Sequence, residues 1–471
     1  MNILFIASEA VPLAKVGGLA DVAGALPKAL IRLGHDVRLL VPQYNGIGER
    51  YALKNEIRGF MLHVLSRPEK VNLNLGRVGE VPVYTLENNS IFNTSEVYVN
   101  DLERFYFFSR AVSELLPHLK WQPQIIHCHD WMTALVPALI GKAGISYHSL
   151  LTIHNLYFQG YYDKHPVIQS ELKARLAEDP SETADWPLRF MAQGIARAGR
   201  VNTVSPTYAR EITTPEHGCG LDNLLRFRGD DLWGILNGID FEVWDPLTDP
   251  YLETHYGPDS LDLKVGCKME LQKACRLPVN PDIPLIGMVQ RLDEQKGLDI
   301  LLPGLDKFLS HSPVQLVIQG IGREDYQQAL RRVVERHPSR MAANLAYEEP
   351  LAHRIYAGCD LFLMPSLFEP CGLGQMIAMR YGAVPVVRHT GGLVDSVPEF
   401  NGDLSEGNGF VFHEYTGEAL YRTLQKALDN YTGNRKRWRT AAERLSRLDF
   451  SWQASARRYE ELYLSLQGLT Y

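Results

Sequence analysis

The 471-residue chain has few cysteines, no basic excess and no long apolar run. None of its six cysteines belongs to a C-x-x-C pair, which argues against a structural zinc site and favours a reducing compartment. Lys and Arg number 48 against 55 Asp and Glu, a formal net charge of −7, so nucleic acid is not an expected partner. No run of 18 apolar residues occurs, so we expect no membrane span.

Three nucleotide-binding and hydrolase motifs are also absent. The chain has no G-x-G-x-x-G, which disfavours an NAD enzyme, and no G-x-x-x-x-G-K-[ST], which disfavours a P-loop NTPase. It lacks G-x-S-x-G, which disfavours an α/β-hydrolase. The N-terminus has no basic region and Glu9 interrupts its apolar run, so it does not have the pattern of a signal peptide.

Short apolar runs alternate with amphipathic segments along most of the chain. This pattern predicts an α/β protein with doubly wound parallel sheets, and the length predicts at least two domains. The expected strands are Asn2–Ser8, Val37–Pro42, Val81–Leu86, Ile125–His129, Leu150–Ile153, Val201–Val204, Trp233–Leu236, Leu285–Gln290, Gln315–Gln319, Asn344–Tyr347, Leu361–Pro365 and Val384–Arg388. Segment 43–80 is less regular, and we expect loops and short strands there. Prolines in the acidic stretch 239–262 indicate a linker or domain edge.

The stretch 9–22 lies between the first expected strand and a helical pattern. Adjacent Gly17 and Gly18 allow close approach of the backbone to a ligand, the start of a helix favours an anion, and Lys15 adds a positive charge. These features suit a phosphate, although a plain strand–turn–helix corner with a solvated lysine remains open. The same pattern recurs from Gly391 to Val397, which indicates two Rossmann-like halves that each offer a glycine loop to a ligand.

Two charged segments follow expected strands in the second half. Arg291 and Lys296 could hold a phosphate at a strand's carboxyl end, although they could equally face water. Glu369 precedes Pro370 and a glycine-rich helix start, a placement that suits binding of sugar hydroxyls. Cys371 has no general base nearby in sequence and is better interpreted as a buried structural thiol.

Three further expected strands end in polar or aromatic residues. His127 and His129 share a strand face and could bind a metal, but no third ligand has suitable spacing, so Asp130 is the better functional candidate. The segment that begins at His154 mixes polar and aromatic groups, as sugar-binding surfaces do, although a loop packed by its own aromatics remains open. Tyr347 offers a flat face for a base.

Together these segments resemble the bacterial glycogen synthases and plant starch synthases over nearly the whole chain. The residues that carry the resemblance are Lys15–Val22, His129–Trp131, His154–Leu156, Asn237–Asp240, Arg291–Leu292, Gln295–Gly297, Glu369–Leu373 and Thr390–Leu393. The resemblance implies the GT-B fold, with two Rossmann-like domains facing a central cleft. It implies an acceptor domain at 1–238 that the C-terminal helix 452–471 joins, and a donor domain at 239–451.

The resemblance also implies an enzyme that moves glucose from ADP-glucose to the non-reducing end of an α-1,4-glucan, with retention and without a cofactor or required metal. It implies a cytoplasmic protein, or one of the plastid stroma if a transit peptide was removed. The residues implied to act in catalysis are Glu369, Lys296, Arg291, Asp130 and His154. Those implied to bind substrate are Lys15, Gly17, Gly18, Asp21, Asn155, Asn237, Gln295, Tyr347, Cys371, Gly372, Leu373, Thr390 and Gly391.

Two positions depart from the family pattern. Many retaining GT-B enzymes carry a second glutamate where this chain has Ile377, and bacterial relatives often carry histidine where it has Met132. Two alternatives remain: a GT-B glycosyltransferase that uses UDP-glucose or another donor, and a glucan-binding homologue without turnover. The joint presence of Lys15, Arg291, Lys296 and Glu369 argues against the second alternative.

Overall fold

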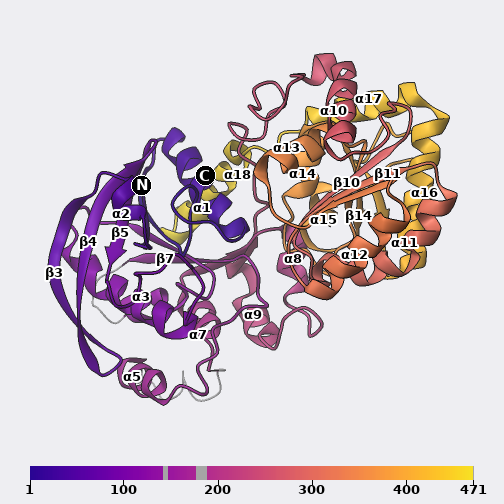
Figure 1. Cartoon of the computed structure of the whole chain (residues 1–471). Helices are drawn as coiled ribbons and strands as arrows, with labels where there is room; N and C mark the ends of the chain where they lie inside the picture. Colours follow the sequence, from indigo (N-terminus) through magenta and orange to yellow (C-terminus); the bar gives the residue numbers. More distant parts are fainter. Residues whose placement is uncertain (142–146, 177–187, 470–471) are drawn as a thin grey trace. The chain divides into compact units, whose positions relative to one another are not determined.

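The computed structural model describes residues 1–141, 147–176 and 188–469, which form two compact α/β units (Figure 1). Unit 1 comprises Met1–Gly238 and Trp452–Tyr471, and unit 2 comprises Ile239–Ser451. Each unit is built on one sheet with helices on both faces, which is the doubly wound architecture that the sequence predicts. In the described part of the chain, no helix is long and apolar enough to cross a membrane.

Unit 1 contains a nine-stranded sheet in the order β3-β4-β5-β2-β1-β6-β7-β8-β9. The strands are β1 (Asn2–Ile6), β2 (Asp36–Pro42), β3 (Lys54–Val64), β4 (Arg67–Val78), β5 (Val81–Glu87), β6 (Ile125–His129), β7 (His148–Ile153), β8 (Arg200–Thr203) and β9 (Leu232–Gly234). All neighbours from β5 to β9 are parallel. The chain reverses its direction of progress across the sheet between β1 and β6, and ligands of such folds bind beyond the carboxyl ends of the strands at this reversal.

The helices of unit 1 lie on the two faces of this sheet. They are α1 (Gly18–Arg32), α2 (Ile47–Arg50), α3 (Asp101–Leu115), α4 (Leu135–Ile140), α5 (Pro166–Leu176), α7 (Phe190–Arg197), α8 (Pro206–Glu211), α9 (Asp222–Arg228) and α18 (Trp452–Leu466). Helices α3, α4 and α7 contact one another in turn, whereas α1 contacts α18. The final helix therefore packs on the first domain, beside the first helix, as Figure 1 shows.

Unit 2 contains a six-stranded parallel sheet in the order β12-β11-β10-β13-β14-β15. Its strands are β10 (Leu285–Val289), β11 (Gln315–Gln319), β12 (Met341–Asn344), β13 (Leu361–Met364), β14 (Val384–Arg388) and β15 (Phe410–Phe412). Its helices are α10 (Lys264–Ala274), α11 (Leu298–His311), α12 (Glu324–Arg336), α13 (Glu349–Gly358), α14 (Gly374–Arg380), α15 (Gly391–Ser396), α16 (Gly417–Gly433) and α17 (Arg435–Ser446). The chain reverses its direction of progress across this sheet between β10 and β13.

The expected strands correspond to observed strands, with one clear shift. Asn344–Tyr347 is wrong by three residues, because β12 pairs with β11 from Met341 to Asn344 and ends there. β12 is mostly half-buried, so its apolar signal is weak. β15, of three residues, is not among the expected strands.

The prediction of loops and short strands for 43–80 is wrong. β3 and β4 are 11 and 12 residues long and form an antiparallel hairpin at the sheet edge. Its turn uses Leu65 and Ser66, both at positive φ, rather than the Asn-Gly or Asp-Gly pair that marks hairpins in sequence. Many of the β3 side chains are exposed or half-buried, so the apolar alternation typical of a strand is diluted.

A buried polar network fixes α18 onto the sheet of unit 1. The Tyr463 hydroxyl lies 2.9 Å from His127 Nδ1, and His127 Nε2 lies 2.6 Å from Thr152 Oγ1. The Thr152 hydroxyl donates to Asn202 Oδ1 at 2.6 Å, and Asn202 Nδ2 donates to the Tyr459 hydroxyl at 3.2 Å. All five side chains are fully buried, so each bond replaces one that water cannot supply.

Replacing Tyr463 by phenylalanine tests this network. Tyr463→Phe leaves a buried ring nitrogen of His127 without its partner, so we expect the free energy of unfolding to fall by about 1–3 kcal/mol. Tyr326→Phe is the matched control, because the Tyr326 hydroxyl makes no hydrogen bond within the described residues; its effect should stay below about 0.5 kcal/mol. Denaturant unfolding of both variants measures the difference, and equal stabilities would contradict the role of the network.

Candidate functional site

Two groups of functional side chains lie at the carboxyl ends of the strands that flank each reversal point. In unit 1 they follow β1, β6 and β7, and in unit 2 they follow β10, β13 and β14. Because the strands are parallel, these ends meet at one edge of each sheet. The two groups are described separately.

Asp130 lies at the end of β6, in the left-handed region with φ of 56°. Its Oδ1 accepts backbone N–H bonds from His154 at 2.7 Å and from Asn155 at 3.3 Å. The structure thus brings together three of the residues that the sequence singles out. Burial raises the pKa of Asp130 to about 7, although the two backbone N–H groups oppose the shift. Near neutral pH this carboxyl group therefore binds and releases a proton readily.

The histidines beside Asp130 are neutral; His127 and His129 are buried and His154 is half-buried. His129 Nδ1 lies 3.0 Å from His154 Nε2. Burial lowers the pKa of His154 to about 3 and the pKa values of His127 and His129 well below their ordinary value. His154 can therefore hydrogen-bond a hydroxyl but supplies no positive charge at neutral pH. In the described residues, no group of three or more His, Cys, Asp or Glu is arranged to hold a metal ion.

Glu9 organises the glycine stretch, a role that the sequence analysis missed. Its side chain is buried, with Oε2 accepting the backbone N–H groups of Val16 and Gly17 and Oε1 accepting the Tyr98 hydroxyl at 2.9 Å. Burial raises the pKa of Glu9, and the charge of Asp21 adds to the rise. The sequence did contain one signal for this role. Segment Ala7–Ala10 is otherwise made of small residues expected to be buried, and a buried carboxylate usually needs hydrogen-bond or charge partners.

Gly17 and Gly18 stand at the start of α1, and protein packing does not require Gly18. A Cβ atom at Gly18 would meet nothing within 4 Å, and its φ lies outside the left-handed region. At Gly17 the nearest atom would be Glu9 Oε1, at 3.6 Å. The missing side chain therefore leaves open space at a helix N-terminus, as an anion site needs. Lys15 Nζ lies 2.7 Å from Asp21 Oδ1 at the rim, where both side chains are partly exposed.

Asn237 is also buried, in the segment that ends unit 1. Its Oδ1 atom is buried and accepts no hydrogen bond within the described part of the chain. An unpaired buried amide oxygen carries a free-energy cost that a bound hydroxyl group would remove.

Lys296 and Glu369 form a buried ion pair in unit 2. Lys296 Nζ lies 2.6 Å from Glu369 Oε2, and the Ser366 hydroxyl donates to the same oxygen at 3.0 Å. The two charged side chains are 13% and 7% exposed. Glu369 Oε1 accepts no hydrogen bond from the described residues, so it can accept one from a ligand hydroxyl. Ser366 is a second contact that the sequence analysis missed.

The loop after β10 holds these groups in place. The Gln295 amide donates to Phe368 O at 3.2 Å, and Leu367 N donates to Gln295 O at 2.8 Å. Gly297 has φ of 75°, and a Cβ atom there would lie 2.0 Å from Pro365 O, so only glycine fits. Arg291 is more loosely held: its guanidinium lies 2.8 Å from Asp293, donates to Gln295 Oε1 at 3.0 Å, and is 55% exposed.

The second glycine pair packs against the Glu369 loop. Gly392 N donates to Glu369 O at 3.0 Å, and a Cβ atom at Gly392 would lie 2.3 Å from Cys371 O. Cys371 is buried, as expected of a structural thiol. Gly391 has φ of 47° at the start of α15. The two similar glycine stretches therefore differ physically, because close packing requires glycine at 392 whereas open space surrounds Gly18.

The remaining predicted residues lie around this loop. Gly372 has φ of 72°, Leu373 precedes α14, and Thr390 is buried just before α15. Tyr347 is 54% exposed in the segment after β12, at the same edge of the sheet.

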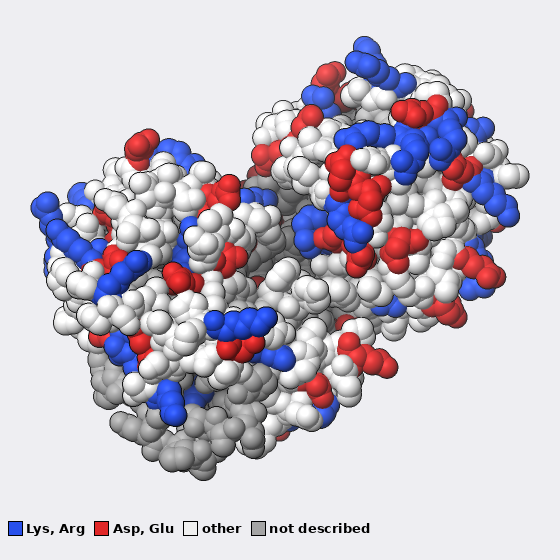
Figure 2. All heavy atoms as spheres, turned by 60° about the horizontal axis from the view of Figure 1, so that its bottom comes forward, with Lys and Arg blue, Asp and Glu red and all other residues white. Residues whose placement is uncertain are grey.

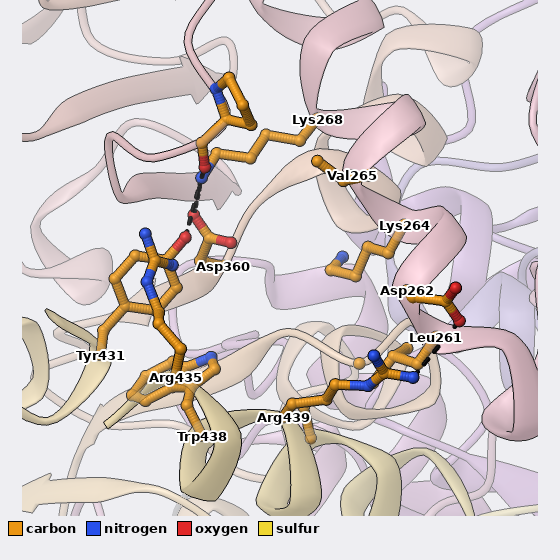
Figure 3. Close-up of a pocket in the computed structure, with 13 residues that line it drawn as sticks. Leu261, Asp262, Lys264, Val265, Lys268, Asp360, Tyr431, Arg435, Trp438 and Arg439 are labelled. Carbon is orange, nitrogen blue, oxygen red and sulfur yellow. Dashed lines mark hydrogen bonds and ion pairs between the residues drawn. The ribbon is translucent and has the colours of Figure 1, made fainter. Parts of the chain in front are cut away.

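A further hollow in unit 2 lies at the opposite end of the strands (Figure 3). Asp360, which directly precedes β13, marks this end. Lys268 Nζ lies 2.7 Å from Asp360 Oδ2, and the Arg439 guanidinium lies 3.3 Å from Asp262. Lys264 donates to the carbonyl groups of Tyr356 and Ala357 near the end of α13. The hollow is distinct from the candidate site because it lies at the opposite end of the strands. Its cations Lys264, Lys268 and Arg439 already have partners within the protein.

The surface carries mixed charge. On the face shown in Figure 2, Lys and Arg side chains form groups with Asp and Glu side chains beside and between them. Binding of a phosphate would therefore depend on local cations such as Lys296 and Arg291 rather than on a broad field.

The fold and these sites define a glycosyltransferase of the GT-B class. Residues 2–227 match the family model described as the starch synthase catalytic domain, and residues 274–445 match glycosyl transferases group 1. The chain is 43% identical to a glycogen synthase of Anaeromyxobacter sp. strain Fw109-5 and 40% identical to glycogen synthase 2 of Geobacter sulfurreducens. These matches cover 99% and 98% of both chains, respectively. This chain belongs to the family of bacterial glycogen synthases and plant starch synthases.

Solved structures give the same result. The catalytic domain of starch synthase IV from Arabidopsis thaliana, bound to ADP and acarbose, matches with a TM-score of 0.88 and 34% identity over 99% of both chains. A sucrose-phosphate synthase from Thermosynechococcus elongatus matches with a TM-score of 0.62 at 17% identity, over 99% of both chains, and shows the shared fold alone.

Gly18→Ala tests whether the open space at α1 serves a ligand. Alanine fits the protein without a clash, so we expect stability to stay level or to rise by up to about 1 kcal/mol. The added methyl group would stand where an anion approaches the helix, so kcat/KM should fall roughly 10- to 100-fold. Gly433→Ala, also in open space at the end of α16, should leave kcat/KM unchanged. Full activity in Gly18→Ala would rule out an anion site there.

Asp130→Asn tests the raised pKa. Between the ordinary pKa of 3.8 and the folded value of about 7, the folded state binds more protons at Asp130 than the unfolded state, so this group makes stability fall as pH rises. Asparagine keeps the acceptor oxygen for His154 and Asn155 without the charge. The variant should therefore gain stability relative to the parent from pH 4 to pH 8. If the difference in free energy of unfolding between the variant and the parent stays constant over this pH range, burial does not raise the pKa of Asp130.

Proposed function

We propose that this protein transfers glucose from ADP-glucose to the non-reducing end of an α-1,4-glucan, with retention of configuration and without a required metal ion. The observation that carries the proposal is the Lys296–Glu369 pair at the reversal point of unit 2. It supplies a cation and a carboxylate oxygen on two loops that hydrogen-bond to each other, which suits a diphosphate joined to a sugar. ADP and acarbose bound to the starch synthase IV relative support this choice of ligands.

The diphosphate would be held by cations and helix starts. Lys296 Nζ makes one hydrogen bond to protein and has two more N–H groups to donate. Arg291 is exposed and weakly held, and Lys15 can exchange its surface partner Asp21 for a phosphate at small cost. The starts of α1 at Gly17–Gly18 and of α15 at Thr390–Gly391 would add backbone N–H groups. Negative charge grows on the phosphates as ADP departs, so these groups stabilise the transition state.

The adenine and glucose groups would be bound by different residues. Tyr347 is exposed and would stack on adenine. Glu369 Oε1 would accept a glucose hydroxyl, with Cys371, Gly372 and Leu373 beside it. In unit 1, Asp130, His154, Asn155 and Asn237 would bind glucose and the acceptor end through neutral hydrogen-bonding groups and one carboxyl group.

We propose same-face transfer as the chemical step. The bond between glucose C1 and the phosphate oxygen breaks, C1 bonds to the acceptor O4, and the 4-OH proton moves to the departing phosphate oxygen. Double displacement would instead need a free carboxylate beneath C1. Glu369 Oε2 accepts from Lys296 and Ser366, and Asp130 Oδ1 accepts two backbone N–H groups, so the protein holds one oxygen of each carboxyl group. We assign the other oxygen of Glu369 to a glucose hydroxyl rather than to attack at C1.

The donor experiment tests this proposal against its two alternatives. Radiolabel transfer from ADP-glucose and from UDP-glucose to glycogen is measured side by side, with and without EDTA. We expect transfer from ADP-glucose that persists in EDTA. Faster transfer from UDP-glucose would show that UDP-glucose, rather than ADP-glucose, is the donor. Binding of ADP without transfer would indicate a non-catalytic homologue. Loss of all activity in EDTA, restored by one metal, would overturn the metal-free mechanism.

Glu369→Gln tests the role of the carboxylate. Glutamine keeps the shape but removes the charge that stabilises an oxocarbenium-like transition state, so kcat should fall roughly 10²- to 10³-fold, with less change in KM for ADP-glucose. Glu349→Gln, an exposed carboxylate at the start of α13, is the matched control and should keep the parent kcat. A covalent glucosyl adduct on Glu369 or Asp130, trapped with a fluorinated donor and seen by mass spectrometry, would show double displacement instead.

A further inference from the structure

The segment after β7 exposes aromatic side chains beside the candidate acceptor residues. In the described residues, five aromatic side chains are more than half exposed, and three of them lie here: Tyr157 at 64%, Phe158 at 51% and Tyr161 at 52%. Exposed aromatic residues gathered in one short segment commonly mark a binding surface. Tyr157 and Phe158 follow His154 and Asn155 directly, so this surface continues the proposed acceptor site.

The segment is rigid beneath these rings. Leu156, Gln159 and Tyr162 are buried below it, so exposed and buried positions are segregated. The Gln159 amide donates to Leu156 O at 2.9 Å and to Cys219 O at 3.2 Å. Gly160 has φ of 63°, and a Cβ atom there would lie 2.3 Å from the Trp131 ring. The exposed rings are therefore not the result of a poorly packed loop.

The same contacts tie the segment to the candidate site. Trp131 directly follows Asp130, so the packing of Gly160 on its ring sets the distance of the segment from the end of β6. The Asn155 side chain accepts the Tyr157 backbone N–H at 3.1 Å, and Asn155 O accepts Phe158 N–H at 3.3 Å. A glucan bound at Asn155 would therefore extend next onto the rings of Tyr157 and Phe158.

The geometry of the rings suits a curved sugar chain. The centroids of Tyr157 and Phe158 are 5.4 Å apart and their planes meet at 86°. An α-1,4-linked glucan curves, so successive glucose rings present their apolar C–H faces in different directions. Two aromatic faces at a right angle can contact two such rings, whereas a single flat ligand could use only one.

We propose that Tyr157 and Phe158 form a stacking platform for acceptor glucose units beyond the one that reacts, and so set a preference for long chains over short ones. This inference rests on the proposed acceptor. Tyr161, over which the Arg189 guanidinium lies 4.8 Å from the ring centroid, stands at the far end of the same segment.

The experiment compares KM for maltoheptaose and for maltose in ring-removing and ring-keeping variants. Tyr157→Leu and Phe158→Leu keep an apolar side chain but lose the flat face, so KM for maltoheptaose should rise about 2- to 13-fold. KM for maltose, which is too short to reach the platform, and KM for ADP-glucose should not change. Tyr157→Phe and Phe158→Tyr keep the ring and should retain the parent values.

Met61→Ala controls for loss of an exposed apolar side chain elsewhere. Met61 is 61% exposed on β3, at the far edge of the same sheet, and its replacement should leave both acceptor constants unchanged. Unchanged KM for maltoheptaose in both leucine variants would overturn the platform, as would an equal rise for maltose.

Direct binding separates this inference from the proposed function. Calorimetry of maltoheptaose binding, without any donor, should show the same 2- to 13-fold weakening in the leucine variants. If the parent protein fails to transfer glucose but binds maltoheptaose through these rings, the proposed reaction falls and the platform stands. If transfer occurs but the leucine variants bind maltoheptaose as tightly as the parent, the platform falls and the reaction stands.

Discussion

The ion pair between Lys296 and Glu369 is the interaction on which the proposed donor half of the site depends. Both charges are largely buried, and burial of an ion pair carries a desolvation cost that the attraction between the charges at best roughly offsets. The surrounding structure is built to keep the pair in place, with Gly297 pressed on Pro365, Gln295 bonded to the Phe368 loop and Gly392 bonded to Glu369. Such an arrangement contributes little to stability and is better explained by the ligand charges that it receives.

The proposed acceptor half, in unit 1, is organised differently. Unit 1 buries Glu9 and Asp130 at the ends of β1 and β6, and both carboxyl groups accept backbone N–H groups from loops that follow neighbouring elements. These bonds shape the loops, while burial raises both pKa values. The histidines nearby stay neutral. In the proposed function, unit 2 would supply most of the charge to a diphosphate, with Lys15 of unit 1 added, while Asp130, His154 and Asn155 of unit 1 and Glu369 of unit 2 would bind sugar hydroxyls.

The sequence predicted the fold well where local signals are strong. Buried strands such as β13 and most of β14 have continuous apolar runs, and glycine pairs mark the starts of α1 and α15. It failed for the β3–β4 hairpin, whose Leu65-Ser66 turn has no sequence signature, and for β12, whose boundary is set by pairing with β11. In the candidate site, the sequence pattern predicted that Asp130, His154 and Glu369 follow strand ends, which is where they lie. The contacts of Glu9 and Ser366 were not predictable, because they join residues whose proximity only the folded chain determines.

Binding of ADP alone separates the roles of the two paired residues most directly. Calorimetry is carried out on the parent protein, Lys296→Met and Glu369→Gln. The account predicts that Lys296→Met weakens ADP about 10- to 100-fold, because a charge-assisted hydrogen bond to phosphate is lost. It predicts that Glu369→Gln binds ADP as tightly as the parent or more tightly, because ADP has no glucose and the carboxylate no longer competes for Lys296. Unchanged ADP affinity in Lys296→Met, or equal losses in both variants, would contradict the assignment of the cation to the diphosphate and the carboxylate to the sugar.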